Sequence, residues 1–385
     1  MNNINFELDV VTGVASDFRH FVGTLIDSSS FGICGGKARL TDVKEGSVAY
    51  SSSAGGDRFK VLLPYAGQTL TWEVVFDKYD PEGSPDFIFG SEDTDFSPDI
   101  AEIKSLVEWD YHNPYSLLNV IDELLKMYKF HQEQIIQAYD RLLFEYSSLI
   151  SDQSGLSTRD IELHTLRCES KVGPICFLIK LPVDFNRIPP YLTKDNPGDD
   201  SAILLISFLS PSSTKVTPQL YLSPKVEHAL GGASNLRIPA FPSDSCLLDY
   251  VPTVSNLLSN KVDQVVANFE KRKEYIAAFL SHFGRSLLEY DAEAFTKISL
   301  MFEWNDFFFI FLVDLPQFFP QEQPVFSFQS IYHHDAKGKP FIESHNDYPY
   351  SPRWSGNEMA QRAKSFILNN ISNFQKASVH SGSLN

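Results

Sequence analysis

One pattern occurs three times along the chain: an apolar, strand-like run leads to a turn with an aromatic residue, then to prolines, and then to another apolar run. Its copies begin near residues 74, 181 and 315. Proline cannot donate to the hydrogen-bond ladder of a sheet, so prolines at these places suit the ends and crossings of an antiparallel meander. The repetition predicts three decorated copies of one α+β unit rather than three unrelated domains.

The chain has 385 residues, which is enough for two or three domains. Strands are expected at residues 59–63, 70–76, 87–89, 175–181, 202–208, 219–222, 296–302, 307–314 and 325–328. Shorter helices are expected over residues 6–21 and 357–368. A polar linker at 151–160 and a long helix after residue 252 divide the chain into units at 1–150, 151–250 and 251–375, with a frayed tail at 376–385.

Two long amphipathic helices are expected to join these units. Apolar residues recur every three to four positions over residues 117–146, after Asn113, which can cap a helix, and Pro114, which suits its first turn. A single helix of about nine turns is too long for one small domain, so its second half is expected to pack elsewhere. A second stripe of this kind covers residues 257–283, after Pro252.

The charge of the chain excludes several classes of partner. Its 32 basic and 49 acidic residues give a net charge of −17, which repels nucleic acids and anionic membranes. The most apolar run, residues 307–313, is far shorter than the ~20 residues that span a bilayer. The start of the sequence lacks the regions of a secretory signal, which favours reduced thiols in cytosol or nucleus. The four scattered cysteines are Cys34, Cys168, Cys176 and Cys246.

Potential metal ligands crowd one short stretch near the C-terminus. They are His333, His334, Asp335, Glu343, His345 and Asp347. The stretch has neither a His-Glu-x-x-His pattern nor the ligand spacing of JAMM metalloproteases, and residues 337–339 indicate a polar turn. The chain also has no Gly-x-Ser-x-Gly motif of a serine hydrolase. We therefore expect a solvated loop, and no metal or other cofactor.

A partner-binding segment is predicted at residues 348–354. Tyr348, Tyr350, Pro352, Arg353 and Trp354 combine the aromatic and arginine side chains that dominate interface hot spots. In the alternative interpretation, Tyr350 and Trp354 pack beneath the closing helix as part of the core. The sequence leaves both interpretations open.

The order of helix, antiparallel meander, proline-bearing turn and helix resembles that of ubiquitin-conjugating enzymes. The residues similar to their signature are Tyr79, Pro81, Pro85, Phe87 and Phe89, followed by Trp109, Pro114, Leu117, Leu118, Ile121, Leu124 and Leu125. In the active enzymes a catalytic cysteine lies between these two groups, because ubiquitin is carried as a thioester. Residues 89–109 contain no cysteine, histidine or asparagine. The chain thus resembles the non-catalytic variants of these enzymes, the UEV domains, and is predicted not to be an enzyme.

A longer resemblance is to the family of the brain and reproductive organ-expressed protein. The matching stretches are residues 57–60, 64–67, 85–90, 181–185, 220–224, 227–232, 275–284, 348–354 and 356–360. Members of this family are subunits of the BRISC deubiquitinase and of a nuclear, BRCA-containing counterpart.

This resemblance implies a scaffold that bridges a JAMM-type zinc deubiquitinase and its Abraxas-like partner to a von Willebrand A-domain subunit. The enzyme would act on non-degradative ubiquitin chains, in the DNA-damage response and in cytoplasmic signalling. The resemblance also implies ubiquitin and serine hydroxymethyltransferase as further candidate partners, and a location in cytoplasm and nucleus. The alternative function is that of a ubiquitin receptor of the UEV type.

Overall fold

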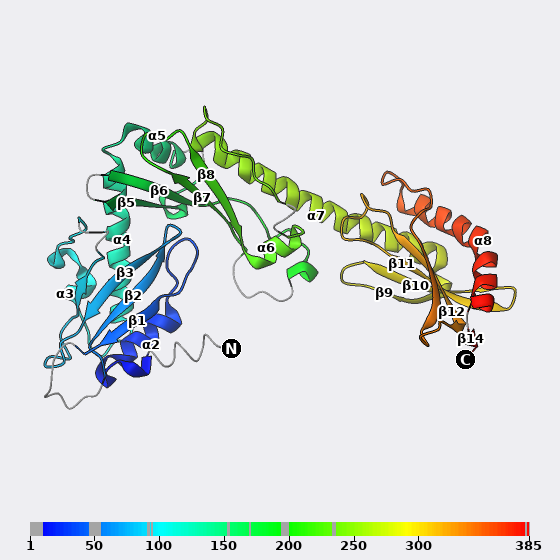
Figure 1. Cartoon of the computed structure of the whole chain (residues 1–385), viewed down its shortest axis with the longest axis horizontal. Helices are drawn as coiled ribbons and strands as arrows, with labels where there is room; N and C mark the ends of the chain where they lie inside the picture. The colour runs from blue at the N-terminus through cyan, green and yellow to red at the C-terminus, as the bar shows by residue number, and fades with distance from the viewer. Residues whose placement is uncertain are drawn as a thin grey trace. The chain divides into compact units, whose positions relative to one another are not determined.

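The computed structural model describes residues 11–45, 55–90, 93, 95–151, 155–168, 171–193, 200–232, 236–381 and 383–384 (Figure 1). The chain forms two compact units. Unit 1 comprises residues 1–183, 199–223 and 237–258, and unit 2 comprises residues 184–198, 224–236 and 259–385. Three antiparallel sheets packed with helices confirm the predicted α+β class. Within the described residues, no helix has the length and apolarity that a membrane span needs.

The first sheet of unit 1 is a meander with the strand order β1-β2-β3-β4. Its strands are β1 (Arg39–Lys44), β2 (Arg58–Tyr65), β3 (Gln68–Val75) and β4 (Asp86–Ile88). Ala66 and Gly67 form the two-residue turn between β2 and β3, and both have positive φ, +47° and +75°. Such a turn matches the twist of a hairpin and fixes the pairing of Tyr65 with Gln68. Side chains on β2 alternate between partly exposed and buried, so one face of this sheet carries the core.

Two helices, α2 (Arg19–Ser28) and α4 (Ser116–Ile136), cover the buried face of this sheet. The other helices of this part of the chain are η1 (Ser16–Phe18), η2 (Ile100–Glu102), α3 (Lys104–Val107) and α5 (Asp140–Leu149). Buried residues of α2 and α4 share one apolar cluster with β2 and β3. The helix expected over residues 6–21 is interrupted: residues 11–13 are helical, Val14 forms an isolated bridge with Gly56, and helical structure resumes with η1 and then α2 at Arg19. Residues 6–10 lie outside the described part.

The stripe over residues 117–146 forms two helices, so the prediction of one long helix was wrong. The chain leaves α4 after Ile136 and enters α5 at Asp140, with Tyr139 in an extended conformation between them. Apolar spacing continues across the break because both helices bury the same kind of face, which a periodic pattern cannot distinguish from one helix. Asn113 also does not cap α4: its Oδ1 accepts a hydrogen bond from the backbone N–H of Tyr115, 3.1 Å away, in the turn before the helix.

The second sheet of unit 1 has the order β5-β6-β7-β8 and is buried on both faces at its centre. Its strands are β5 (Ile161–Cys168, after η3 at Thr158–Asp160), β6 (Lys171–Lys180), β7 (Ala202–Phe208) and β8 (Val216–Leu222). Ile203 and Leu205 on one face of β7 join the core of the first sheet. On the other face the guanidinium of Arg141 in α5 lies 5.4 Å from the ring centre of Phe208. Burial on both faces explains the continuous apolar run of β7.

Buried Glu162 on β5 joins the two sheets of unit 1. Its carboxylate accepts the backbone N–H of Ile33 through Oε1 and that of Ala66 through Oε2, each at 2.8 Å. Burial is the largest influence on this group and raises its pKa, although the two N–H donors and the nearby Lys129 act in the opposite direction. A single side chain thus satisfies backbone donors that lie 129 and 96 residues away in the sequence.

Glu145 plays a similar part at the start of α7 (Leu247–Phe283). Its buried carboxylate on α5 accepts the backbone N–H of Leu247, the first residue of α7, at 2.7 Å. The first N–H groups of a helix have no partner within it, and a negative charge there is favourable. Burial raises the pKa of Glu145 as well. The helix begins five residues before Pro252, which lies inside it, so the start expected after Pro252 was too late.

Unit 2 is built on a sheet with the order β13-β12-β11-β10-β9, with β14 beside β12. Its strands are β9 (Leu287–Tyr290), β10 (Lys297–Trp304), β11 (Phe307–Asp314), β12 (Val325–His334), β13 (Pro340–His345) and β14 (Ser383–Leu384). Its helices are η4 (Pro190–Thr193), α6 (Pro224–Ala229), the C-terminal part of α7, η6 (Gly284–Ser286) and α8 (Gly356–Ser381). The frayed tail predicted from residue 376 is instead helical up to Ser381, and Ser378 is fully buried.

Aromatic side chains dominate the core of unit 2. Phe309 and Phe311 of β11 and Phe328 of β12 pack with residues of α7 and α8 in one cluster. The ring centres of Phe311 and Phe328 are 5.3 Å apart in an edge-to-face arrangement, a favourable geometry for aromatic pairs. Buried Arg272 on α7 donates to the carbonyl oxygens of Ala294, 3.1 Å away, and Gln317, 3.2 Å away. It thereby ties two loops of the sheet to the helix.

All nine predicted strand runs coincide with strands or overlap them, whereas β1, β5, β9, β13 and β14 were not anticipated. The domain boundaries at 150, 250 and 375 stay a prediction, beside the two compact units that the chain forms.

Candidate interaction surfaces

The segment 348–354 lies between β13 and α8, and its two tyrosines are attached to the loop that precedes β12. The hydroxyl of Tyr348 donates to the carbonyl oxygen of Pro324 at 2.5 Å, and that of Tyr350 donates to the carbonyl oxygen of Pro320 at 2.6 Å. The Tyr348 ring stacks on Phe326, with ring centres 4.4 Å apart. Burial raises the pKa of Tyr348 strongly and that of Tyr350 to about 12, so both hydroxyls are neutral donors at physiological pH.

Trp354 is half-buried beside α8. The guanidinium carbon of Arg362 lies 3.8 Å from the centre of its ring, a cation–π contact, and Arg362 also forms an ion pair with Glu358 at 3.0 Å. Pro352 and Arg353 are exposed at the tip of the segment. The five predicted contact residues therefore divide: both tyrosines and Trp354 pack against the core edge, and Pro352 and Arg353 face solvent.

A cavity of about 300 Å³ opens beside this segment. Tyr348, Tyr350 and Trp354 form part of its wall, together with Phe366 of α8. These rings serve the fold and still present surface to a cavity, so the two interpretations open at the sequence level are compatible. The assignment of the segment as a partner contact stays a prediction.

The described thiols do not resemble the activated nucleophile of a ubiquitin-conjugating enzyme. Burial raises the pKa of Cys34, with a smaller contribution from Glu162, and burial also raises the pKa of Cys246. Both shifts disfavour the thiolate that would attack. Cys176 is buried on β6, with its Sγ 3.6 Å from the hydroxyl of Ser207. The side chain of Cys168 lies outside the described residues.

The histidines and acidic residues from His333 to His345 belong to the β12–β13 hairpin, and Asp347 follows β13. Nδ1 of His333 lies 3.2 Å from the hydroxyl of Ser330, and Asp335 accepts the backbone N–H groups of Lys337 and Lys339 across the turn. Nε2 of His345 lies 3.4 Å from a carboxylate oxygen of Glu343. In the part of the chain that the structure describes, no three His, Cys, Asp or Glu side chains are grouped so that they could hold a metal ion.

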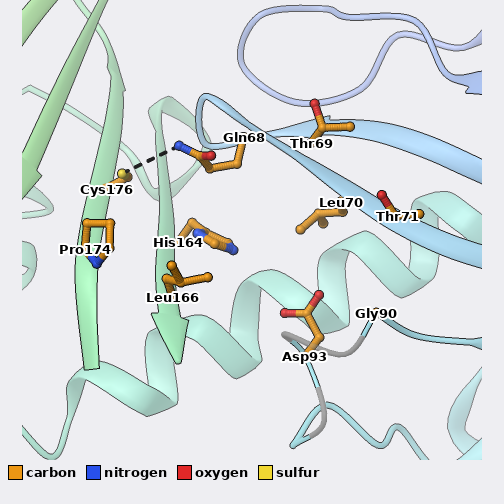
Figure 2. Close-up of a pocket in the computed structure, with 10 residues that line it drawn as sticks. All are labelled: Gln68, Thr69, Leu70, Thr71, Gly90, Asp93, His164, Leu166, Pro174 and Cys176. Atoms are coloured by element: carbon orange, nitrogen blue, oxygen red, sulfur yellow. Dashed lines mark hydrogen bonds between the residues drawn. The ribbon is translucent and has the colours of Figure 1, made fainter. Parts of the chain in front are cut away.

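Sequence reasoning missed a second cavity, in unit 1. It has a volume of about 460 Å³ and lies beside the first half of β3 (Figure 2). His164 and Leu166 of β5 line one side and Asp93 another, and Gln68 donates to the Sγ of Cys176 across 3.9 Å. We name it the β3-edge cavity. No sequence motif predicts this cavity, because its residues come from segments that are about 100 positions apart.

The face of the unit 2 sheet opposite its aromatic core offers a third surface. Met301, Ile310 and Leu312 lie on adjacent strands and project away from the face that carries the aromatic core. Met301 and Ile342 are exposed, at 42% and 49%. Exposed apolar side chains that gather on one face of a sheet are typical of protein contacts.

Comparison with known proteins assigns the chain to a family. The family model described as "Brain and reproductive organ-expressed protein (BRE)" matches residues 13–334. A protein of Branchiostoma floridae named "BRISC and BRCA1-A complex member 2" is 48% identical over 371 residues, which cover 95% of this chain and 96% of that protein. A Danio rerio protein of the same name is 46% identical over 390 aligned positions, which cover both chains completely. The chain therefore belongs to the family of the brain and reproductive organ-expressed protein.

Proposed function

We propose that this chain is a non-catalytic scaffold subunit of a deubiquitinase complex of the BRISC and BRCA1-A type. The observation that carries the proposal is the similarity over the full length of the chain to two proteins that are named as members of these complexes. Similarity that covers both units favours a shared assembly role, because partner surfaces on either unit would be retained.

Within this proposal the catalytic zinc belongs to a partner. The chain bridges a JAMM-type zinc deubiquitinase with its Abraxas-like partner to a von Willebrand A-domain subunit, in cytoplasm and nucleus. Serine hydroxymethyltransferase is a further candidate partner. The exposed aromatic and aliphatic side chains of unit 1 suit docking to large proteins; on α4 and α5 they are Phe130, Leu143 and Phe144. The sheet face of unit 2 that carries Met301 and Ile342 provides a second such surface.

Affinity purification of the full chain from its native source tests the assembly. We expect a JAMM-type metalloprotease and a von Willebrand A-domain protein to co-purify in fixed ratio, and to stay associated during size-exclusion chromatography. Recovery of the chain without either protein would contradict the proposal. The activity of the purified complex on ubiquitin chains should be lost on zinc chelation, since the metal acts in the partner.

A separate assay tests the lack of catalysis. Incubated with ubiquitin-activating enzyme, ATP and ubiquitin, the chain should form no thioester, because no cysteine lies between residues 89 and 109 and the pKa values of Cys34 and Cys246 are raised. A ubiquitin adduct that reductant removes, and that disappears when Cys168 and Cys176 are replaced, would overturn this part of the proposal.

The alternative function is that of a ubiquitin receptor. Antiparallel meanders packed with helices are compatible with the UEV resemblance on which it rests. Titration of the full chain with free ubiquitin separates the two roles: saturable binding below the millimolar range supports a receptor, whereas binding that is millimolar or absent leaves the scaffold alone.

A further inference from the structure

Strand β3 is paired along its whole length on one edge and along only part of the other. All eight residues of β3 pair with β2. On the opposite edge β4 is three residues long and pairs only with Glu73, Val74 and Val75. Among the described residues no strand lies beside the first half of β3 on this edge.

The turn between β2 and β3 determines which backbone groups face the open edge. In a two-residue hairpin the residues that flank the turn exchange both hydrogen bonds, and this pairing repeats at every second position. The backbone groups of Gln68, Leu70 and Trp72 therefore bond to β2. The bond from the N–H of Phe76 to the carbonyl oxygen of Asp57 follows the same alternation. The N–H and C=O groups of Thr69 and Thr71 consequently point to the opposite edge.

An independent observation supports this orientation. A Cβ atom built on Gly90 would lie 3.3 Å from the carbonyl oxygen of Thr71, so this oxygen faces the loop after β4 and not β2. Pro64, which pairs with Thr69 across the hairpin, has no N–H to donate, as expected for a non-hydrogen-bonded pair of the β2–β3 ladder.

The neighbouring edge of β5 differs, because α4 covers it. The backbone N–H of Thr165 donates to Oε1 of Gln132 at 2.9 Å, and Nζ of Lys129 donates to the carbonyl oxygen of Ile161 at 2.7 Å. Proteins usually protect strand edges in such ways, since an open edge is a template for another strand. Among the described residues no strand pairs with the edge at Thr69 and Thr71 and no helix is bonded to it as α4 is to β5. Gly90 lies beside the Thr71 carbonyl oxygen, and the edge lines the β3-edge cavity.

The cavity also carries a charge preference. Figure 2 shows the carboxylate of Asp93 directed toward the beginning of β3. One of its oxygens accepts the hydroxyl of Tyr128 at 2.6 Å, and the other points toward Gly90. The surrounding chain is strongly acidic, with a net charge of −17. A basic side chain is the favoured occupant beside Asp93.

We propose that the β3-edge cavity binds an extended peptide segment of a partner protein, which adds as a strand to β3 at Thr69 and Thr71 and places a lysine or arginine beside Asp93. Main-chain hydrogen bonds to the edge provide affinity in this mode of recognition, and the pocket provides specificity. The proposal does not depend on the deubiquitinase assembly, since it concerns the edge and cavity of unit 1 alone.

Two synthetic hexapeptides of alternating valine and threonine, one with a central arginine and one with a glutamate in its place, are the probes. We expect the full chain to bind the arginine peptide at least about tenfold more tightly than the glutamate peptide, in fluorescence anisotropy titrations. In Asp93→Asn the two affinities should become similar, because the side chain keeps its shape and its contact with Tyr128 but loses its charge. Absence of saturable binding of the arginine peptide, or an unchanged preference in Asp93→Asn, would overturn the proposal.

A matched pair of substitutions tests the backbone pairing. Thr71→Pro removes both the hydroxyl and the N–H that faces the open edge, whereas Thr71→Val removes the hydroxyl and keeps the N–H. Peptide binding should be lost in the proline variant and kept in the valine variant, with both chains folded as judged by circular dichroism. Amide hydrogen exchange at Thr69 and Thr71 should slow when the peptide binds to the unmodified chain. Exchange that is already slow in the free chain would contradict an open edge, and this readout does not require the proline variant to fold.

Discussion

Units 1 and 2 bury charged groups of opposite sign. In unit 1, the carboxylates of Glu145 and Glu162 accept backbone N–H groups from segments about a hundred residues away. In unit 2, the buried guanidinium of Arg272 donates to backbone carbonyl oxygens, while the acidic Asp291 lies at a partly exposed turn. In both units a buried charged side chain provides a hydrogen-bond partner for backbone groups that no strand pairs. They make the two units respond differently to substitution and to pH.

The largest expected effect is the loss of stability when a core phenylalanine of unit 2 is removed. Phe311→Ala removes a fully buried ring from the aromatic cluster of unit 2 and should reduce the free energy of unfolding by ~3–5 kcal/mol. Chemical denaturation with hydrogen exchange resolved by unit should locate the loss in unit 2. The control is Phe130→Ala, an exposed phenylalanine of α4, which should change stability by less than ~0.5 kcal/mol. Equal losses of stability in the two variants would show that burial of the ring does not determine the loss in the free energy of unfolding.

Glu162 should be the most sensitive polar position of unit 1. Glu162→Ala leaves the N–H groups of Ile33 and Ala66 without their acceptor, at a cost of ~2–4 kcal/mol in the free energy of unfolding. Glu162→Gln keeps one acceptor and should cost less than half of that. Glu108→Ala, at an exposed position, is the control for loss of a carboxylate. If Glu162→Ala lowers the free energy of unfolding no more than Glu108→Ala does, then Glu162 does not link the two sheets.

A smaller effect is expected at the aromatic segment of unit 2. Because Trp354 is half-buried, Trp354→Ala should reduce stability by ~1–2 kcal/mol, less than a core aromatic. If the segment is also a partner contact, Arg353→Ala should weaken partner capture while the melting temperature stays constant, since Arg353 is exposed. Unchanged capture in both variants would exclude the segment as an interface.

The smallest effect concerns pH and has opposite signs in the two units. Burial raises the pKa of Glu162, so its contribution to stability is full below the unfolded pKa of ~4.3 and is lost as pH rises through the folded value. For Asp291 burial is outweighed by hydrogen bonds from Thr296 and from backbone N–H groups, which lower the pKa. Its contribution is therefore present above ~3.9 and is lost as pH falls through the folded value.

Denaturation curves between pH 7 and pH 3 measure these contributions. In Glu162→Gln, the free energy of unfolding of unit 1 should rise less on mild acidification than in the original chain. In Asp291→Asn, the free energy of unfolding of unit 2 should fall less at lower pH. Variants with the pH profile of the original chain would show that these two groups do not titrate as inferred.

Local patterns predicted more of the fold than of the sites. Phe307–Asp314 was predicted with its observed bounds, because β-branched and aromatic residues concentrate between clear turn signals. β1 and β5 were missed because polar residues such as Asp42 and Glu162 interrupt their apolar pattern. The same polar residues form the links between segments, and no spacing rule connects Glu162 with Ile33. The β3-edge cavity was inaccessible for the same reason, since its walls meet only in three dimensions.

The division of the chain between the units also has a consequence for synthesis. The polypeptide passes from one unit to the other at residues 183–184, 198–199, 223–224, 236–237 and 258–259. Chains emerge from the ribosome at roughly 5–20 residues per second, with N-terminal domains usually free to fold first. Here the hairpin of β2 and β3 can form early, but Glu145 must wait 102 residues for Leu247. Until Leu247 has been synthesised, unit 1 is incomplete and the carboxylate of Glu145 stays hydrated. A chaperone that binds the nascent chain would therefore act mainly during this interval.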